Sequence, residues 1–262
     1  MKLLVCIKQV PDMDSQFVIE KSTGWLDETD LAFRINEYDE YAIEAAICLK
    51  EQLQMEPEIT VLSIGPRRVE DALKKALAMG CDKGIHVLDE AYFEKDSWQI
   101  ANVIATVARD KAFDLIFTGL QSQDRGSAQV GVVLAELLNF QCITTLVDFS
   151  FKDGVVAAKR ELEGGVKALA TAKLPAVITC QLGLNTPRYP TLPNIIKAKR
   201  KETLTFPIAN LLKEESLIVT EKIYAAPKKH GGLLLEGDLE TMADRLAGIL
   251  KERTAAVRQE HR

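Results

Sequence analysis

The residues best suited to chemistry lie between residues 119 and 131, in the polar segment GLQSQDRGSAQVG. The segment follows an apolar run of strand length and leads directly into a helical pattern. Backbone N–H groups at the start of a helix can hold a phosphate, and Arg125 supplies a positive charge. The loop therefore predicts a phosphate or nucleotide site, with an ordinary strand-to-helix connection as the alternative.

Motifs of other common sites are missing from the sequence. It contains no GxGxxG, GxxxxGK[ST], HExxH or GxSxG, and its His86, His230 and His261 are isolated. The 5 cysteines are scattered, and an odd number without clustering argues against disulfides and thiolate metal sites. We expect no metal site, and we expect the three histidines to be structural or solvated.

The elements that must position the polar loop alternate between strand-length apolar runs and helical patterns, which is typical of a parallel sheet covered by helices. In such sheets ligands bind beyond the carboxyl ends of the strands, where the chain order reverses. The segments CIKQ, from Cys6, and SIGP, from Ser63, also follow strand patterns and could converge there with the loop. Expected strands are 3–7, 59–64, 84–88, 113–118 and 176–180, and expected helices are 36–53, 66–79, 97–110 and 130–139.

Local signals refine these elements. Asn36 is expected to cap a helix, and Pro66 to lie in the first turn of another. Gly164 and Gly165 join two alternating segments, which predicts a hairpin added to the sheet. Three prolines at 187, 190 and 193 predict a stiffened projecting loop. An amphipathic helix follows the connector APKKHGG near the end of the chain, where it could pack on its own domain or dock elsewhere.

Composition bounds the class of protein. The 262 residues suit one large α/β unit, or one domain with appendages. A net charge of -5 provides no global basic field for nucleic acid or an anionic membrane. No run approaches the roughly 20 apolar residues of a membrane span, and the start MKLLVCIKQVPD suggests a strand rather than a signal peptide. We expect a soluble, cytoplasmic protein without nucleic-acid partners.

One long run, RELEGGVKALATAKLPAVITCQLGLNTPRYPTLPNIIKAK over 160–199, resembles the signature region of electron transfer flavoprotein beta subunits. VCIKQVPD, INEYDEYAIEAA, KKALAMGCDKGIHV and the polar loop are also similar to that family. The resemblance covers most of residues 1–205. It implies an α/β fold with an open, mostly parallel sheet and helices on both faces, like the adenine nucleotide alpha hydrolases, plus a hairpin, a recognition loop and a C-terminal helical arm.

The resemblance implies an electron carrier rather than an enzyme. An alpha subunit would hold most of the FAD, and this chain would complete the FAD site and bury AMP. Electrons would pass from acyl-CoA or related dehydrogenases, as in fatty acid beta-oxidation, to a membrane quinone oxidoreductase. Residues 1–205 would form the nucleotide-binding domain, with the recognition loop at 184–200. Residues 206–262 would form an extension and helix contacting the partner subunit.

The family's cofactor residues carry over onto the strand ends, the start of the first long helix and the polar loop. They are Cys6, Asn36, Glu37, Tyr38, Asp39, Ile64, Gly119, Gln121, Ser122, Asp124, Arg125, Gly126, Ser127, Ala128, Gln129, Val130, Gly131 and Val132. Tyr38 matches a position beside the flavin ring, although a core tyrosine on the helix face is an equal interpretation. Met13 occupies another position at which some members have tyrosine.

The resemblance also assigns docking residues. Leu192, flanked by Pro190 and Pro193, matches a leucine that anchors in the partner dehydrogenase, and the prolines would reduce its ordering cost. Glu161 matches an acid that pairs with an arginine of the alpha subunit, or is a surface hairpin carboxylate. A basic run could steer acidic partners or be a solvated edge; it comprises Lys197, Lys199, Arg200 and Lys201.

Two other functions stay open. Electron-bifurcating members hold a second FAD in place of AMP and oxidise NADH, and VCIKQVPD resembles that group. Their loop reads like DGDTAQVG, whereas here Asp124 is followed by Arg125, which suits a terminal phosphate and favours AMP. The other alternative is a stand-alone adenine-nucleotide sensor of similar fold.

Overall fold

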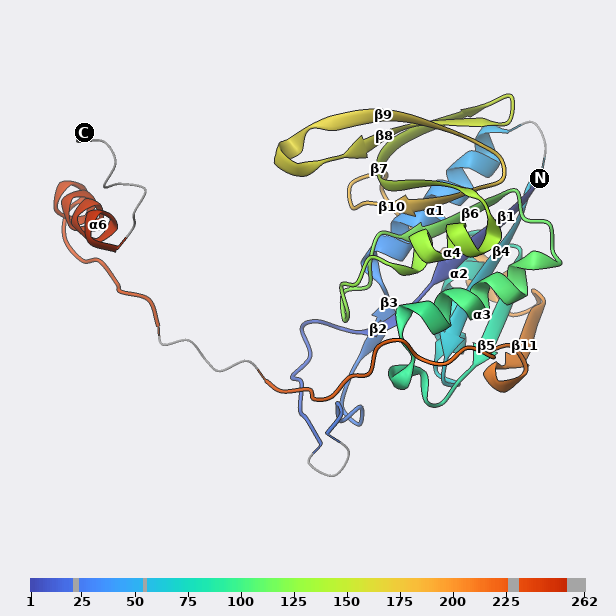
Figure 1. Cartoon of the computed structure of the whole chain (residues 1–262), viewed down its shortest axis with the longest axis horizontal. Coiled ribbons are helices and arrows are strands. Elements are labelled where there is room, and N and C mark those ends of the chain that lie inside the picture. The colour runs from blue at the N-terminus through green and yellow to red at the C-terminus, as the bar shows by residue number, and fades with distance from the viewer. Residues whose placement is uncertain (21–23, 54–55, 226–230, 254–262) are drawn as a thin grey trace. The chain divides into compact units, whose positions relative to one another are not determined.

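The computed structural model describes residues 1–20, 24–53, 56–225 and 231–253. These belong to two compact units, Met1–Ile223 and Tyr224–Arg262. The expected division after residue 205 differs from this one, because it would cut through a strand at Thr203–Pro207 that belongs to the larger unit. Figure 1 shows the larger unit as a sheet with helices on both of its faces.

The larger unit is built on a nine-stranded sheet in the order β11-β5-β4-β1-β6-β10-β7-β8-β9. Neighbours from β11 to β7 pair in parallel, and β7, β8 and β9 pair antiparallel. A separate antiparallel pair, β2 with β3, lies between β1 and the first helix in the chain. The strands are β1 (Lys2–Ile7), β2 (Gln9–Pro11), β3 (Phe33–Ile35), β4 (Glu58–Gly65), β5 (Lys83–Leu88), β6 (Leu115–Gly119), β7 (Gln141–Lys152), β8 (Val155–Glu161), β9 (Lys167–Lys173), β10 (Ala176–Cys180) and β11 (Thr203–Pro207).

Two apolar layers cover the sheet. On β1 the alternation of the strand turns Leu3 and Val5 toward the layer under α1 and α2, and Leu4 and Cys6 toward the layer under α3 and α4. Because both faces of the central strands are buried, their sequences are nearly continuous apolar runs. The helices of the larger unit are α1 (Glu37–Gln52), α2 (Val69–Met79), α3 (Ser97–Arg109), α4 (Val130–Leu138) and α5 (Leu192–Ala198). Short 3-10 turns occupy Tyr92–Glu94, Glu163–Gly165 and Ile208–Asn210.

The order of the strands fixes where a ligand can bind. From β1 the chain moves outward to β4 and β5, and then returns to β6 on the other side of β1. The loops that follow β1, β4 and β6 therefore diverge at a reversal of chain order, which leaves a crevice at their carboxyl ends. The predicted fold class, an open and mostly parallel α/β sheet, is confirmed.

Most predicted elements are present, with two local corrections. Helix α2 begins at Val69 rather than Pro66; the N–H of Val69 donates to the Pro66 carbonyl at 3.0 Å, so Pro66 opens a turn before the helix. The predicted recognition loop is also partly helical, because α5 starts at Leu192 with a proline in its first turn. Within 184–200, residues 184–191 and 199–200 lie outside regular elements.

The predicted hairpin is confirmed as β8 paired with β9, and β7 extends it to three strands. Strands β7 and β11 were not predicted. Strand β7 is long and irregular, with Thr145 in a left-handed conformation (φ 56°) and a register shift after Leu146. Strand β11 pairs in parallel with β5 and forms one edge of the sheet.

The smaller unit contains α6 (Leu239–Arg253), the predicted amphipathic helix. The side chain of Asp238 accepts the N–H of Thr241 at 2.8 Å and so caps the N-terminus of this helix. Part of the predicted connector and the end of the predicted helix, at 226–230 and from 254 onward, lie outside the described residues. Among the helices that the structure describes, none has the length and apolar character needed to cross a membrane.

Candidate functional site

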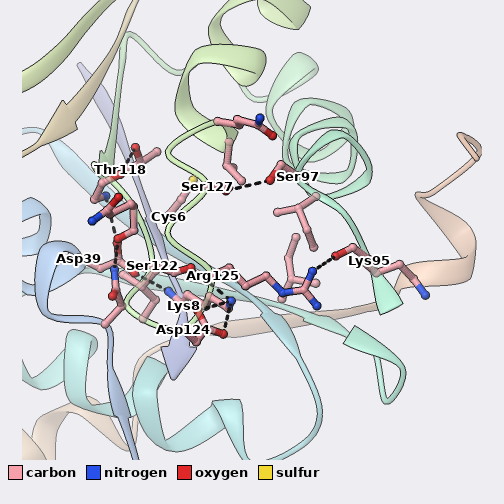
Figure 2. A pocket seen from close by; sticks show the side chains of 18 of the residues that line it. Cys6, Lys8, Asp39, Lys95, Ser97, Thr118, Ser122, Asp124, Arg125 and Ser127 are labelled. Carbon is pink, nitrogen blue, oxygen red and sulfur yellow. Dashed lines mark hydrogen bonds and ion pairs between the residues drawn. The ribbon is translucent and has the colours of Figure 1, made fainter. Parts of the chain in front are cut away.

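A pocket lies where the sheet predicts it, at the carboxyl ends of β1, β4 and β6. Figure 2 shows polar side chains from β1, α1, α3 and the loop after β6 facing one another across this space. Leu62, Ile64, Ile100 and Ile104 line an apolar part, and the loop 119–131 lines much of the polar part. An apolar slot beside a row of polar groups can take a planar ring and a phosphate of the same ligand.

The start of α1 forms one side of the pocket through two buried side chains. Asn36 donates to the Gln121 carbonyl at 2.9 Å and accepts the N–H of Gln123 at 3.0 Å. Asn36 is the N-cap residue of α1, as predicted, but its side chain makes no capping hydrogen bond to the backbone of that helix. Both of its partners are in the polar loop, and Asn36 therefore holds the loop against α1.

Asp39 joins the ends of β1 and β6. Its carboxylate accepts the N–H of Lys8 at 2.7 Å and that of Gly119 at 3.0 Å. Burial raises the pKa of Asp39 to about 7, against the opposing effect of those two N–H groups. A side chain on Gly119 would collide with Asp39, so glycine is required for this close approach. Asp39 thus positions the backbone around the pocket.

Lys8 places a positive charge inside the pocket. Its ammonium pairs with Asp124 at 2.6 Å and lies 3.5 Å from the Ser122 hydroxyl, as Figure 2 shows. Burial lowers the pKa of Lys8, and the neighbouring Asp124 opposes that change. The side chains of Lys8 and Asp124 are 30% and 22% exposed, so the pair stays accessible to a ligand in the pocket.

Arg125 reaches across the mouth of the pocket. Its guanidinium donates to the Lys95 carbonyl at 3.1 Å and also to the Phe93 carbonyl. It lies 5.8 Å from the centre of the Trp25 ring, which in turn packs on Phe93. Arg125 therefore fastens the loop to the segment before α3, in addition to any charge it offers a ligand.

Two helix starts face the pocket from the other side. Ser127 of the loop and Ser97 at the start of α3 are hydrogen-bonded through their hydroxyls at 3.0 Å. Ala128 takes a left-handed conformation (φ 51°) just before α4. Within the described chain, the N–H groups of Ser127 and Gln129 have no hydrogen-bond acceptor. They are the donors that a phosphate at the start of α4 would use.

Gly131 brings the start of α4 close to the sheet. A Cβ atom at this position would lie 2.6 Å from Thr179 Cγ2 and 2.8 Å from Thr118 Oγ1. Only glycine allows this approach without displacing β6 or β10. The start of α4, with the N–H groups that are free within the described chain, therefore lies directly against the ends of β6 and β10.

Most of the residues carried over from the family resemblance come together here. Those lining the pocket are Cys6, Asn36, Asp39, Ile64, Gly119, Gln121, Ser122, Asp124, Arg125, Ser127, Ala128, Gln129, Val130 and Gly131. Glu37, Tyr38, Gly126 and Val132 lie outside the lining. Glu37 and Tyr38 instead accept hydrogen bonds from Gln123 and Gln121, at 3.0 and 3.2 Å, and so support the loop from α1.

Lys8 lines the pocket, in agreement with the prediction that the segment CIKQ converges there, although it was not among the residues carried over from the family. Other lining residues were not predicted, notably Trp25, Lys95 and Ser97. Trp25, Lys95 and Ser97 carry no comparable signal, because their contacts with the pocket come from distant parts of the chain. Among the described residues, no group of three or more metal-binding side chains is assembled.

The predicted docking residues lie on other parts of the larger unit. Leu192 is 71% exposed at the start of α5, beside the exposed Tyr189 and Ile196. Glu161 accepts a hydrogen bond from Gln181 at 3.0 Å. The basic run is not uniformly solvated, because the Lys201 ammonium donates to the Leu77 and Cys81 carbonyls and caps the end of α2.

Comparison with known proteins places this arrangement in a family. A family model described as "Electron transfer flavoprotein domain" matches residues 23–211. The chain is 38% identical to the electron transfer flavoprotein subunit beta of Bacillus subtilis, over 98% of this chain and 100% of the relative. It is 31% identical to that of Methylophilus methylotrophus, over 96% and 98% of the two chains. With the human subunit it shares 34% identity over 77% of this chain and 79% of the relative. The chain therefore belongs to the electron transfer flavoprotein beta-subunit family.

Proposed function

We propose that this chain is the beta subunit of a heterodimeric electron carrier, binding AMP in the pocket and completing the FAD site of an alpha subunit. The observation that carries the proposal is the start of α4, where the N–H groups of Ser127 and Gln129 have no acceptor among the described residues and line the same pocket as the apolar Ile64 and Ile104. The carrier would accept electrons from acyl-CoA or related dehydrogenases, as in fatty acid beta-oxidation. It would pass them to a membrane quinone oxidoreductase from the cytoplasm, without inserting in the membrane.

The residues of this chain would bind and orient rather than react. The adenine ring would lie in the apolar slot between Ile64 and Ile104, and the phosphate at the start of α4 near Gln129. Lys8 would supply the nearest positive charge. FAD would supply the electron transfer itself, while the protein sets its surroundings and access to partners. Tyr38 and Met13 are the residues we assign to the flavin side, and Glu161 to an arginine of the alpha subunit.

Docking of a dehydrogenase is assigned to the start of α5. Leu192 is 71% exposed and has proline on either side, at Pro190 and Pro193. The prolines limit the backbone conformations that binding would have to freeze, so less entropy is lost on docking. Lys197, Lys199 and Arg200 flank this position and would steer an acidic partner.

Counting the released ligands tests the proposal. The chain is co-expressed with the alpha subunit from the same source, and the purified complex is denatured in acid. One FAD and one AMP per heterodimer is the expected result. A stable colourless homodimer that binds ATP would refute the carrier function and support the adenine-nucleotide sensor.

A second candidate is an electron-bifurcating subunit with FAD in this pocket, which would oxidise NADH. The observation that favours it is that Pro11, Trp25 and Leu26 line the pocket in addition to the strand ends and the polar loop, and a second FAD would have more groups to contact there than AMP. Two FAD and no AMP per heterodimer would establish this candidate in place of the first.

A further inference from the structure

One short segment contacts both the polar loop and the beginning of the C-terminal chain. Lys95 accepts a hydrogen bond from Arg125 of the loop at 3.1 Å, and Ser97 is bonded to Ser127 of the loop at 3.0 Å. Between them lies Asp96, which lines the pocket and is 5% exposed. Figure 2 shows Arg125 reaching the backbone carbonyl of Lys95, and Ser127 beside Ser97 at the start of α3.

The two oxygens of Asp96 have different partners. One accepts the N–H of Gln99 at 2.8 Å and so caps α3. The other accepts the N–H groups of Leu217 at 2.6 Å and Ile218 at 3.0 Å. Gln99 adds a bond from its amide to the Glu214 carbonyl at 3.0 Å. The carboxylate thus ties residues 214–218 to the start of α3.

The segment 214–218 is the last part of the larger unit held in this way. Upstream, Leu211 and Leu212 pack against the core beside α3. Beyond Ile218, no hydrogen bond joins the described residues 219–223 to the rest of the larger unit. Leu217 and Ile218 are 71% and 61% exposed, so hydrophobic burial does not fix this segment. Asp96 holds its end at Leu217 and Ile218, and Gln99 holds its start at Glu214.

We propose that Asp96 is a positioning residue that couples the nucleotide loop to the start of the C-terminal chain, so that a nucleotide in the pocket and an ordered segment 214–218 stabilise each other. The coupling to a nucleotide rests on the proposed function of the pocket. A ligand that orders the loop holds Lys95 and Ser97 in place through Arg125 and Ser127. Asp96 lies between those residues and carries the effect to Leu217 and Ile218. Coupling of this kind is reciprocal between the two sites.

The charge state of Asp96 is consistent with this role. Burial alone would raise its pKa, but the N–H groups of Gln99, Leu217 and Ile218 outweigh that effect and lower it. The carboxylate is therefore ionised at neutral pH and able to accept all three bonds.

The decisive variant is Asp96→Asn. An amide oxygen still accepts the N–H of Gln99, and Asn caps helices about as well as Asp. The amide NH₂, however, cannot accept the N–H groups of Leu217 and Ile218. Asp238→Asn is the matched control, because Asp238 also caps a helix, at Thr241, and the partner of its side chain lies in that helix of the smaller unit.

Amide hydrogen exchange and AMP titration are measured on the full-length chain in the complex in which it purifies, after removal of bound nucleotide. In the wild type and in Asp238→Asn, AMP should slow exchange at Leu217 and Ile218 by about fivefold or more. In Asp96→Asn this slowing should disappear, and AMP should bind more weakly by a similar factor.

A second variant tests the coupling without ligand. Ser127→Ala removes the bond to Ser97 and should speed exchange at Leu217 and Ile218 in the nucleotide-free protein. If the wild type binds no AMP, the proposed nucleotide function fails, and this variant still decides the coupling. Exchange at these two amides that responds neither to AMP nor to Ser127→Ala overturns the inference.

Discussion

At the scale of residues, the charge in the pocket is governed by the pair of Lys8 and Asp124. The ion pair of 2.6 Å leaves the ammonium partly neutralised in the absence of a ligand. A phosphate would compete with Asp124 for Lys8, so the two side chains have opposite effects on an anionic ligand. Their variants separate a role in ligand binding from a role in holding the loop.

Lys8→Met should weaken AMP binding by about tenfold or more, because it removes a charge-assisted hydrogen bond and leaves the Asp124 carboxylate facing the phosphate. Asp124→Asn should strengthen it, because Lys8 is then free for the ligand. Titration of the nucleotide-free complex with AMP measures the affinity of each variant. If AMP binds equally weakly to both variants, the ion pair serves only to hold the conformation of the polar loop.

Arg125 calls for a different pair of substitutions. Arg125→Ala should reduce both AMP retention and the melting temperature of the complex, while the visible spectrum of the flavin stays nearly unchanged. The reason is that Arg125 holds the loop to the Phe93 and Lys95 carbonyls, and a ligand that binds only the folded state stabilises it.

Arg125→Lys distinguishes the charge that this side chain offers a ligand from its hydrogen bonds to two carbonyls. Lysine keeps the charge, but it lacks the planar guanidinium that donates to both carbonyls at once. If the carbonyl contacts dominate, Arg125→Lys should resemble Arg125→Ala. Unchanged nucleotide content and melting temperature in Arg125→Ala would remove this residue from the site.

The sequence predicted the lining residues that lie at the carboxyl ends of strands, such as Cys6, Ile64 and Gly119. It did not predict the role of Asn36, because a polar residue before a helix has the same local pattern whether it caps that helix or reaches a loop 85 residues away. The Lys8–Asp124 pair spans 116 residues and has no local signal. Partners brought together only by the sheet cannot be inferred from spacing along the chain.

At the scale of elements, Arg188 fastens the loop before α5 to α1. Its guanidinium bonds to Glu44 at 2.8 Å and to Glu51 at 2.6 Å, and its backbone N–H also donates to Glu44 at 3.0 Å. Asn185 adds a bond to the Tyr41 carbonyl at 3.0 Å. Helix α1 therefore supports the polar loop at its first turn and the loop before α5 along its length.

Arg188→Ala should lower the free energy of unfolding at pH 7 by about 1.5–3 kcal/mol, the usual value for a hydrogen bond to a charged group. The Arg188 guanidinium lowers the pKa of Glu51, and it lowers that of Glu44 despite the opposing effect of burial. The ordinary value for both is 4.5. Because the folded-state pKa values are depressed, this stability is present above pH 4.5 and is lost as the pH falls below it.

Chemical denaturation between pH 7 and pH 3 measures this effect. Arg188→Ala should flatten the loss of stability below pH 4.5 relative to the wild type. Lys159→Ala is the control, because Lys159 pairs with Asp148 at 2.6 Å but both side chains are at least half exposed; such pairs contribute little. Parallel pH curves for the wild type and Arg188→Ala would contradict the assignment.

Element types were predictable where the periodicity is strong, as in α3 and β10. Strand β7 was missed because the left-handed Thr145 and the shift after Leu146 interrupt its alternation. Helix α5 was not predicted because three closely spaced prolines favour a loop, whereas Pro193 lies in the first turn of the helix, where its missing N–H costs nothing.

At the scale of the whole molecule, the start of α5 is an apolar surface with a defined support. Tyr189, Leu192 and Ile196 are 90%, 71% and 54% exposed. The underside of α5 packs against the core through Ala198, and Arg188 fixes the loop that leads into the helix. An exposed apolar cluster on a rigid support is typical of a contact surface for another protein.

Leu192→Ala should weaken docking of the cognate dehydrogenase while sparing the fold. Removing a well-packed leucine from an interface costs roughly 1.5–3 kcal/mol, or about a ten- to hundredfold loss of affinity. In the free protein this side chain is 71% exposed, so its removal leaves no cavity. Leu169→Ala is the control. Leu169 is 85% exposed on β9, an edge strand of the sheet, and its removal should change neither docking nor stability.

The melting temperature, the FAD content and the rate of flavin reduction by the dehydrogenase are measured on the same preparation of each variant. Slow reduction in a stable, fully loaded Leu192→Ala complex supports the anchor, whereas a lowered melting temperature with normal docking would show that Leu192 serves the fold instead.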